Sequence, residues 1–170
     1  MQRQIILITG GQRSGKSLYA EREALRLSPR PVYVATAHVG DEEFRERVRR
    51  HQERRGPEWT TVEEEFSPGD HDFTGRVVLV DCVTLWCTNL FFREGERVDA
   101  AYAAFAREFD RLTAREAVFI FVSNEIGLGG VSENALMRRF TDLQGLANQY
   151  VASRADRVVL MVSGLPLQVK

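Results

Sequence analysis

The feature that most constrains the fold of this chain is a glycine-rich turn between an apolar run and a helical pattern. The run Ile5-Ile6-Leu7-Ile8-Thr9 leads directly into a segment with the spacing G-x-x-x-x-G-K-S. A strand, this turn and then a helix form the arrangement in which backbone N–H groups surround a phosphate. The predicted nucleotide-binding residues of this phosphate-binding loop are Gly10, Gly11, Gln12, Arg13, Ser14, Gly15, Lys16 and Ser17.

The last two residues of the loop carry its chemistry. Lys16 supplies a positive charge to the β- and γ-phosphate oxygens, so we expect it to be catalytic, and the Ser17 hydroxyl can ligate Mg²⁺. A helix that begins near Lys16 directs the positive end of its dipole at the same anion. The loop therefore predicts a nucleoside triphosphate with Mg²⁺, and it does not distinguish ATP from GTP because it contacts phosphates and not bases.

Length, charge and cysteine content exclude several other classes. The chain has 170 residues, of which 44% are hydrophobic, and this predicts one domain over residues 1–170. A formal net charge of -1 gives no overall attraction to nucleic acid or to an anionic membrane. No apolar run is long enough to span a bilayer, so we expect a cytoplasmic protein. Cys82 and Cys87 have no further Cys or His at metal-site spacing, so we expect reduced packing residues.

Apolar runs and helical patterns alternate along the chain. Strands are predicted at residues 5–8, 31–35, 77–80, 118–122 and 158–162, and helices at 18–27, 42–54, 83–92, 98–115 and 134–154. This order predicts an α/β fold like that of P-loop NTPases, with a mostly parallel central sheet and helices on both faces. Ligands of such sheets bind at the carboxyl ends of the strands, so the residues that follow each run are candidate site residues.

Short or acidic side chains follow the second and third runs. Ala35, Thr36, Ala37 and His38 either let a ligand approach the backbone or form a plain turn. Asp81 either holds Mg²⁺ through water or caps the helix predicted from Val83. Given the phosphate-binding loop, the magnesium role is favoured for Asp81, and Thr84 in the first turn of that helix is expected to face the same crevice.

A glycine-rich segment follows the fourth run. Residues 123–130 read Ser-Asn-Glu-Ile-Gly-Leu-Gly-Gly, and glycine at this density indicates either a tight or mobile segment near substrate or a flexible surface loop. Ser132 and Asn134 are candidates to cap the helix that comes next.

One histidine is a candidate for covalent chemistry. In the helix predicted over 42–54, Phe44, Val48 and His51 share one face, and arginines flank the histidine. His51 is then either a packed side chain or a neutral imidazole that attacks a phosphorus atom whose oxygens the arginines hold. Spacing alone leaves both alternatives open.

The sequence motifs together resemble one family. The loop is followed by Arg47-Val48-x-x-His51-Gln52-x-x-Arg55, by Trp59-x-Thr61-x-Glu63, by Asp81-Cys82-Val83-Thr84 and by Asn124-Glu125-Ile126-Gly127. In this order, and over essentially the whole chain, they are similar to the bifunctional adenosylcobinamide kinase/adenosylcobinamide-phosphate guanylyltransferase family of cobalamin synthesis. The chain departs from the usual pattern at Gln12, Ser132 and Thr141.

The resemblance implies two reactions on one corrinoid substrate. The family phosphorylates adenosylcobinamide with ATP or GTP and then transfers GMP from GTP to the new phosphate, releasing pyrophosphate. By motif, His51 is the nucleophile that carries GMP, and a homotrimer is implied, an assembly that can place sites between subunits. The Mg²⁺ ligands expected from the loop and from the end of the third run are Ser17 and Asp81. The nucleotide-binding residues expected beyond the loop are Ala35, Thr36, Ala37, Gln52, Glu53, Arg54, Arg55, Glu63 and Thr84.

Two other functions fit the loop alone. One is a small-molecule kinase without nucleotidyl transfer, in which His51 is a packing residue. The other is a nucleotide-gated binding protein in which the segment Gly127 to Gly130 changes shape with the γ-phosphate.

Overall fold

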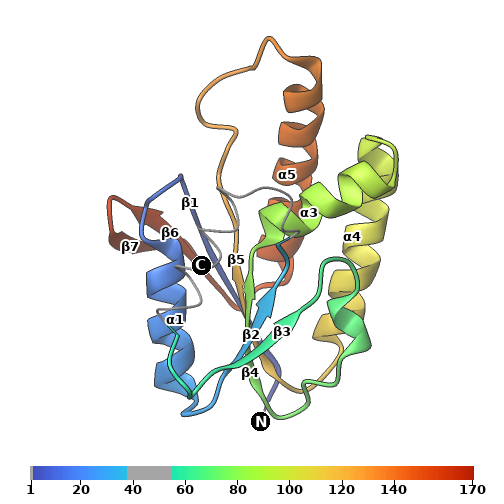
Figure 1. Cartoon of the computed structure of the whole chain (residues 1–170). Helices are drawn as coiled ribbons and strands as arrows, with labels where there is room; N and C mark the ends of the chain where they lie inside the picture. The colour runs from blue at the N-terminus through green and yellow to red at the C-terminus, as the bar shows by residue number, and fades with distance from the viewer. Residues whose placement is uncertain (1, 38–54) are drawn as a thin grey trace.

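The computed structural model describes residues 2–37 and 55–170 and contains a single twisted sheet flanked by helices (Figure 1). The predicted helix over 42–54 and the predicted site residues His51, Gln52, Glu53 and Arg54 lie outside the described residues, as does His38. The elements are β1 (Gln4–Gly10), α1 (Lys16–Leu27), β2 (Val32–Ala35), β3 (Thr60–Glu63), the 3-10 turn η1 (Pro68–Asp70), β4 (Val77–Asp81), α3 (Val83–Arg93), α4 (Val98–Thr113), β5 (Val118–Val122), α5 (Ala135–Arg154), β6 (Arg157–Val162) and β7 (Leu165–Gln168).

The sheet is mostly parallel, as predicted. Its seven strands lie in the order β3-β2-β4-β5-β1-β6-β7, and only the β6–β7 pair is antiparallel. β1 lies inside the sheet, with β5 on one side and β6 on the other. The carboxyl ends of the parallel strands therefore meet at one edge, where the phosphate-binding loop follows β1.

Helices cover both faces of the sheet. On one face, Ala20 and Ala24 of α1 pack with Ile6 and Ile8 of β1. On the other face, aromatic side chains of α3 and α4 such as Trp86 and Phe105 pack against the alternate strand residues, and α5 completes the layer (Figure 1). Successive strand side chains point to opposite faces, so strands covered on both sides are apolar throughout.

The predicted strands and the described helices agree closely with the observed ones, but two strands were missed. β3 is an edge strand with the sequence Thr-Thr-Val-Glu, and its half-exposed surface produced no apolar run. β7 is short, exposed along its length and contains Pro166. Edge strands lack a second partner and a second covering layer, and so lack the continuous apolar signal used to find the others.

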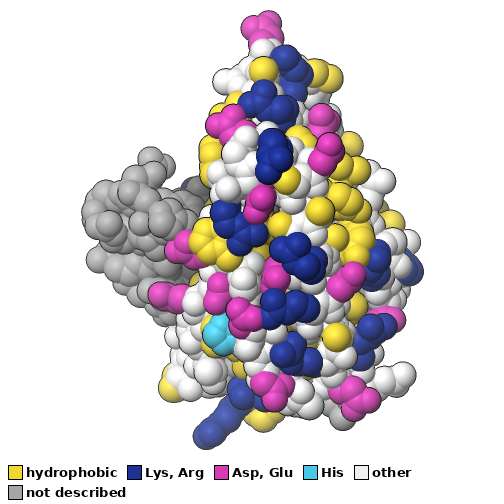
Figure 2. Space-filling model, turned by 90° about the vertical axis from the view of Figure 1, so that its right-hand side faces the viewer, with side chains coloured by type: hydrophobic (Ala, Val, Ile, Leu, Met, Phe, Trp, Pro, Cys, Tyr) yellow, Lys and Arg dark blue, Asp and Glu magenta, His cyan; other side chains and the backbone are white. Residues whose placement is uncertain are grey.

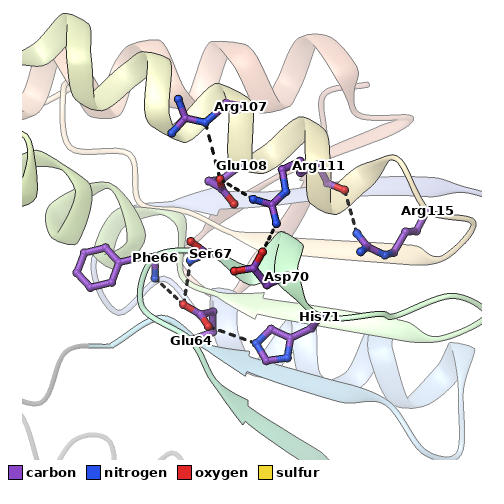
Figure 3. A network of polar contacts seen from close by, with 9 residues as sticks. All are labelled: Glu64, Phe66, Ser67, Asp70, His71, Arg107, Glu108, Arg111 and Arg115. Carbon is purple, nitrogen blue, oxygen red and sulfur yellow. Dashed lines mark hydrogen bonds and ion pairs between the residues drawn. The ribbon is translucent and has the colours of Figure 1, made fainter.

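The surface over α4 carries charges of both signs. Figure 2 shows Lys or Arg and Asp or Glu side chains interspersed over this face. Part of this pattern is a polar network that joins the β3–β4 connection to α4 (Figure 3). Arg111 of α4 bonds Asp70 of η1 and Glu108, and Arg115 lies 3.5 Å from Asp72.

None of the helices in residues 2–37 and 55–170 has the length and apolar character that a membrane-spanning helix needs.

Candidate active site

The phosphate-binding loop joins β1 to α1 as the sequence predicts. Gly10 has a φ of +152°, and a Cβ there would lie 2.7 Å from the Met161 carbonyl oxygen of β6. Gly15, the N-cap residue of α1, adopts a left-handed φ of +92°. Only glycine fits both the close approach and the left-handed turn, so these two residues fix the shape of the loop.

Lys16 lies inside the loop. Its side chain is almost fully buried, and its ammonium donates hydrogen bonds to the Gly11 carbonyl at 2.5 Å and to Ser14 Oγ at 3.5 Å. Burial lowers the pKa of Lys16, while the charge of Asp81 and the Cys82 thiol act in the opposite direction. The ammonium thus bonds neutral oxygens here, and a phosphate oxygen would be a stronger, charged partner.

Asp81 lies at the carboxyl end of β4, and its negative charge acts to raise the pKa of Lys16. Its Oδ2 accepts a hydrogen bond of 3.1 Å from the Tyr33 hydroxyl. The alternative role as a helix cap is wrong, because Cys82 caps α3 with its Sγ 3.4 Å from the Leu85 nitrogen. Burial, and then the charge of Asp81, raise the pKa of Tyr33 well above 10, so the phenol stays protonated and donates.

Asp81 and Ser17 are the predicted Mg²⁺ ligands, and this role stays a prediction. In the described part of the chain no three His, Cys, Asp or Glu side chains cluster as a metal cage. Mg²⁺ characteristically takes one or two protein oxygens and completes its shell with water and substrate phosphates. Asp81, with one carboxylate oxygen bonded to Tyr33, and Ser17 on the neighbouring loop supply a donor set of that kind.

Thr36 joins the ends of β2 and β4. Its buried hydroxyl donates to the Cys82 carbonyl and accepts from the Cys82 N–H, at 2.8 Å each. Asn89 of α3 donates to the Thr36 carbonyl at 2.8 Å. The side chain of Thr36 therefore holds the site-bearing strands together, and contact of Ala35, Thr36 and Ala37 with nucleotide stays a prediction.

A polar network lies at the carboxyl end of β5. Thr84 Oγ1 accepts hydrogen bonds from the backbone and side-chain nitrogens of Asn124, at 3.1 and 3.0 Å. Asn148 of α5 donates to the Asn124 carbonyl, and Gln144 Nε2 donates to Ser123 Oγ. The backbone N–H of Glu125 donates to the Gly10 carbonyl at 3.0 Å, so this network adjoins the phosphate-binding loop. Thr84 is thus bonded to the segment that follows β5, and its contact with nucleotide stays a prediction.

The segment after this network is exposed. Leu128 and Val131 present 84% and 87% of their surfaces to solvent. Asn134 caps α5, since its Oδ1 accepts from the Leu136 and Met137 nitrogens, and Ser132 Oγ accepts from the Asn134 nitrogen. The predicted cap of this helix is confirmed. The large exposed side chains make residues 126–133 a surface segment beside the site.

A cavity of about 550 Å³ lies beside the second and third strands. Its volume is in the range of small-molecule sites. It contains two of the predicted nucleotide-binding residues, Arg55 and Glu63. Glu63 ends β3 directly opposite Ala35 of β2, so the cavity reaches the same edge of the sheet as the loop. The lining residues are Arg55, Gly56, Trp59, Thr61 and Glu63.

Tyr33 separates this cavity from Asp81. The Arg55 guanidinium carbon lies 3.5 Å from the Tyr33 ring centroid, and Trp59 meets the ring edge-on at 6.0 Å. Nε and Nη1 of Arg55 are buried and have no hydrogen-bond partner among the described residues. Buried guanidinium donors are usually paired, so Arg55 has donors to offer a ligand.

The structure thus brings together most of the predicted residues that it describes. The charge of Asp81 acts on Lys16, Arg55 and Glu63 share a cavity, and Thr84 joins the β5 network. Sequence reasoning assigned no site role to Tyr33, Gln144 or Asn148, although Asn148 is among the positions that resemble the family. Tyr33 lies within an apolar run, and the other two lie within a long helix. Only strand order and helix packing bring these three to the site.

Comparisons with known proteins identify a family over the whole chain. Residues 6–169 match the family described as cobinamide kinase / cobinamide phosphate guanyltransferase. The chain is 41% identical to the bifunctional adenosylcobalamin biosynthesis protein CobP of Pseudomonas aeruginosa over 169 residues, covering 96% of each chain. It is 35% identical to CobU of Salmonella typhimurium, covering 98% of this chain and 99% of that one. CobU of Escherichia coli is 37% identical, with the same coverage.

Solved structures agree on the fold. The flagellar accessory protein FlaH of Methanocaldococcus jannaschii superposes with a TM-score of 0.51 and 15% identity, covering all of this chain and 80% of that one. An ATPase of a bacterial type III secretion system gives a TM-score of 0.56 at 10% identity, covering 97% of this chain and 56% of that one. These likenesses concern the fold alone. By its sequence, the chain belongs to the cobinamide kinase/cobinamide phosphate guanyltransferase family, and it is a bifunctional enzyme of cobalamin biosynthesis.

Proposed function

We propose that both reactions of this enzyme use one nucleotide site, in which the phosphate-binding loop holds the triphosphate and the cavity at Arg55 and Glu63 holds the base. The observation that carries this proposal is the contact chain from the cavity through Tyr33 to Asp81, whose charge acts on Lys16. A carboxylate accepts hydrogen bonds, and guanine offers N–H donors on its ring and exocyclic nitrogens. Glu63 therefore suits GTP in the guanylyl transfer.

In the kinase step, the hydroxyl of the aminopropanol arm of adenosylcobinamide attacks the γ-phosphorus of ATP or GTP. The bond to the β-phosphate oxygen breaks, the nucleoside diphosphate leaves, and the hydroxyl proton passes to water. Lys16 and the loop amides stabilise the charge on the transferred group. Ser17 and Asp81 would hold Mg²⁺, which neutralises charge on the β- and γ-phosphate oxygens.

In the second step, the His51 imidazole attacks the α-phosphorus of GTP, and pyrophosphate leaves. The phosphate of adenosylcobinamide phosphate then attacks the GMP on His51, giving adenosylcobinamide-GDP and free histidine. This covalent relay divides one difficult transfer into two easier ones. The support for His51 is the family motif, and the predicted contacts of Gln52, Glu53 and Arg54 have the same basis.

Labelling with GTP that carries radioactive α-phosphorus tests the relay. We expect wild-type protein to retain an acid-labile, alkali-stable label. His51→Ala should abolish both the label and GMP transfer while sparing the kinase reaction, because the γ-phosphate does not pass through histidine. His71→Ala is the matched control, since His71 contacts Glu64 outside the cavity and should leave labelling unchanged. Retention of the label by His51→Ala, or no label on wild type, would sink the relay.

We also propose that residues 1–170 act as one unit in a cytoplasmic homotrimer. The support is the family resemblance together with exposed apolar side chains along the sheet edge, where Leu165, Leu167 and Val169 are 71%, 56% and 64% exposed. Light scattering of the purified protein should then give the mass of three chains.

A further inference from the structure

One buried side chain touches both halves of the proposed site. Tyr33 in the middle of β2 is only 4% exposed. Its hydroxyl donates to Asp81 Oδ2, one face of its ring lies under the Arg55 guanidinium, and its edge meets Trp59. No motif of the sequence contains Tyr33, and neither reaction step above uses it.

Strand register determines which residues of β4 lie next to Tyr33. β2 pairs with β4 so that Tyr33 lies opposite Leu79 and Ala35 lies opposite Asp81. Tyr33 and Asp81 are therefore diagonal neighbours on one face of the sheet, a separation that an aromatic side chain can bridge. This is the face that α1 covers, and α1 begins at Lys16. The bond between Tyr33 and Asp81 thus lies on the face that α1 covers, at the carboxyl end of β4.

We propose that Tyr33 is a positioning residue that couples the base-binding cavity to the magnesium carboxylate, its hydroxyl fixing the orientation of Asp81 and its ring supporting Arg55. With one carboxylate oxygen held by Tyr33, the other is set for the metal or its water. The ring face offers a cation–π contact that keeps the guanidinium at the wall of the cavity. This inference rests on the proposed roles of Asp81 and Arg55.

Two substitutions separate the two contacts. Tyr33→Phe removes the hydroxyl and keeps the ring, so Asp81 loses its donor while Arg55 keeps its platform. Tyr33→Leu removes both contacts. A purely structural role for Tyr33 would instead lower stability without separating metal dependence from nucleotide affinity.

Binding measurements test the coupling without turnover. GTP affinity is measured by calorimetry in EDTA and in Mg²⁺, and Mn²⁺ binding to the GTP complex by electron paramagnetic resonance. For Tyr33→Phe we expect wild-type affinity for GTP in EDTA and a roughly 10- to 100-fold weaker affinity for Mn²⁺, the effect of one lost hydrogen bond to a charged group. For Tyr33→Leu we expect GTP affinity to fall in EDTA as well.

A double-mutant cycle and a matched control complete the test. In an Asp81→Ala background, Tyr33→Phe should no longer change Mn²⁺ affinity, because its partner is absent. Tyr102→Phe on α4, whose ring packs against Tyr150, should match wild type throughout. Unchanged Mn²⁺ affinity in Tyr33→Phe, or an equal effect in the Asp81→Ala background, would overturn the coupling. Failure of wild type to bind GTP would instead overturn the proposed site itself.

Discussion

At the scale of single residues, Glu64 is a carboxylate whose surroundings favour its charged form. It follows β3 and accepts hydrogen bonds from the Phe66 and Ser67 nitrogens at 3.0 and 2.9 Å, and its other oxygen lies 3.3 Å from His71 (Figure 3). Burial raises the pKa of Glu64, but the hydrogen bonds from Ser67, Phe66 and His71 outweigh it and lower the pKa below 4.5.

Stability should therefore depend on Glu64 at acid pH. Because the folded-state pKa is lowered, the contribution is fully present above pH 4.5 and is lost as the pH falls through the folded-state value. Glu64→Gln should cost about 1 kcal/mol of unfolding free energy at pH 7. The cost should shrink as the pH falls below 4.5, because wild type then loses the same contribution.

Urea denaturation at neutral and acid pH checks this expectation. Glu133→Gln, on the exposed segment before α5, should match wild type at both values. A cost for Glu64→Gln that stays constant or grows toward acid pH would show that the charge of Glu64 contributes nothing to folding.

At the scale of elements, η1 packs against α4 without room for a side chain. A Cβ at Gly69 would lie 2.9 Å from Arg111 Cβ and 3.2 Å from the Leu112 nitrogen. Gly69→Ala should therefore force the two elements apart and lower the unfolding free energy by about 1–3 kcal/mol. Unfolding in urea measures the change.

A second glycine of the chain gives the opposite expectation. Gly145 lies within α5, and a Cβ there would meet nothing within 4 Å. Gly145→Ala should raise stability by about 0.5–1 kcal/mol, because alanine loses less backbone entropy in a helix. Equal effects of the two substitutions would mean that helix propensity, and not the η1–α4 contact, decides the result.

The strands show how far the sequence predicts the fold. Strands buried on both faces, such as Val118–Val122, were predicted because every residue in them is apolar. β3 and β7 were missed because edge strands are exposed and carry polar residues or proline. Local sequence patterns therefore predict burial well. They predict a strand only where the residues of that strand are also buried.

The site was predictable where its residues form a local motif. Lys16 and Ser17 follow from the loop, and Asp81 follows from its place after a strand. Tyr33 did not follow, because it reads as one more core residue and its partner Asp81 is 48 positions away in sequence. The pairing of β2 with β4 joins them, and no local pattern contains that information.

At the scale of the whole molecule, the order of strands assembles the proposed site from five segments of the chain. These segments hold the phosphate-binding loop, Tyr33, the cavity, Asp81 with Thr84, and Asn124. In the proposed function, one such site serves both reactions. Lys16→Ala should therefore lower both kinase and guanylyl-transfer rates by about 100-fold or more, the scale expected for loss of a charge that stabilises the transition state.

Separate assays of the two products test the shared site. His51→Ala should impair mainly GMP transfer, in contrast to Lys16→Ala. Lys170→Ala, a change at the only other lysine of the chain, should leave both rates unchanged. Wild-type GMP transfer in Lys16→Ala would instead require two separate nucleotide sites.

The position of β1 also determines how late in synthesis this strand can pair. β1 carries the phosphate-binding loop and is near the start of the chain, yet it pairs only with β5 and β6, which begin at residues 118 and 157. A ribosome delivers the N-terminal part of a chain first, so β1 waits unpaired while more than half of the protein is made. Contacts this distant in sequence slow folding, and unpaired strand edges favour aggregation. Synthesis at low temperature or with chaperones should therefore increase the soluble yield. Bound nucleotide cannot stabilise the fold until most of the sheet has formed.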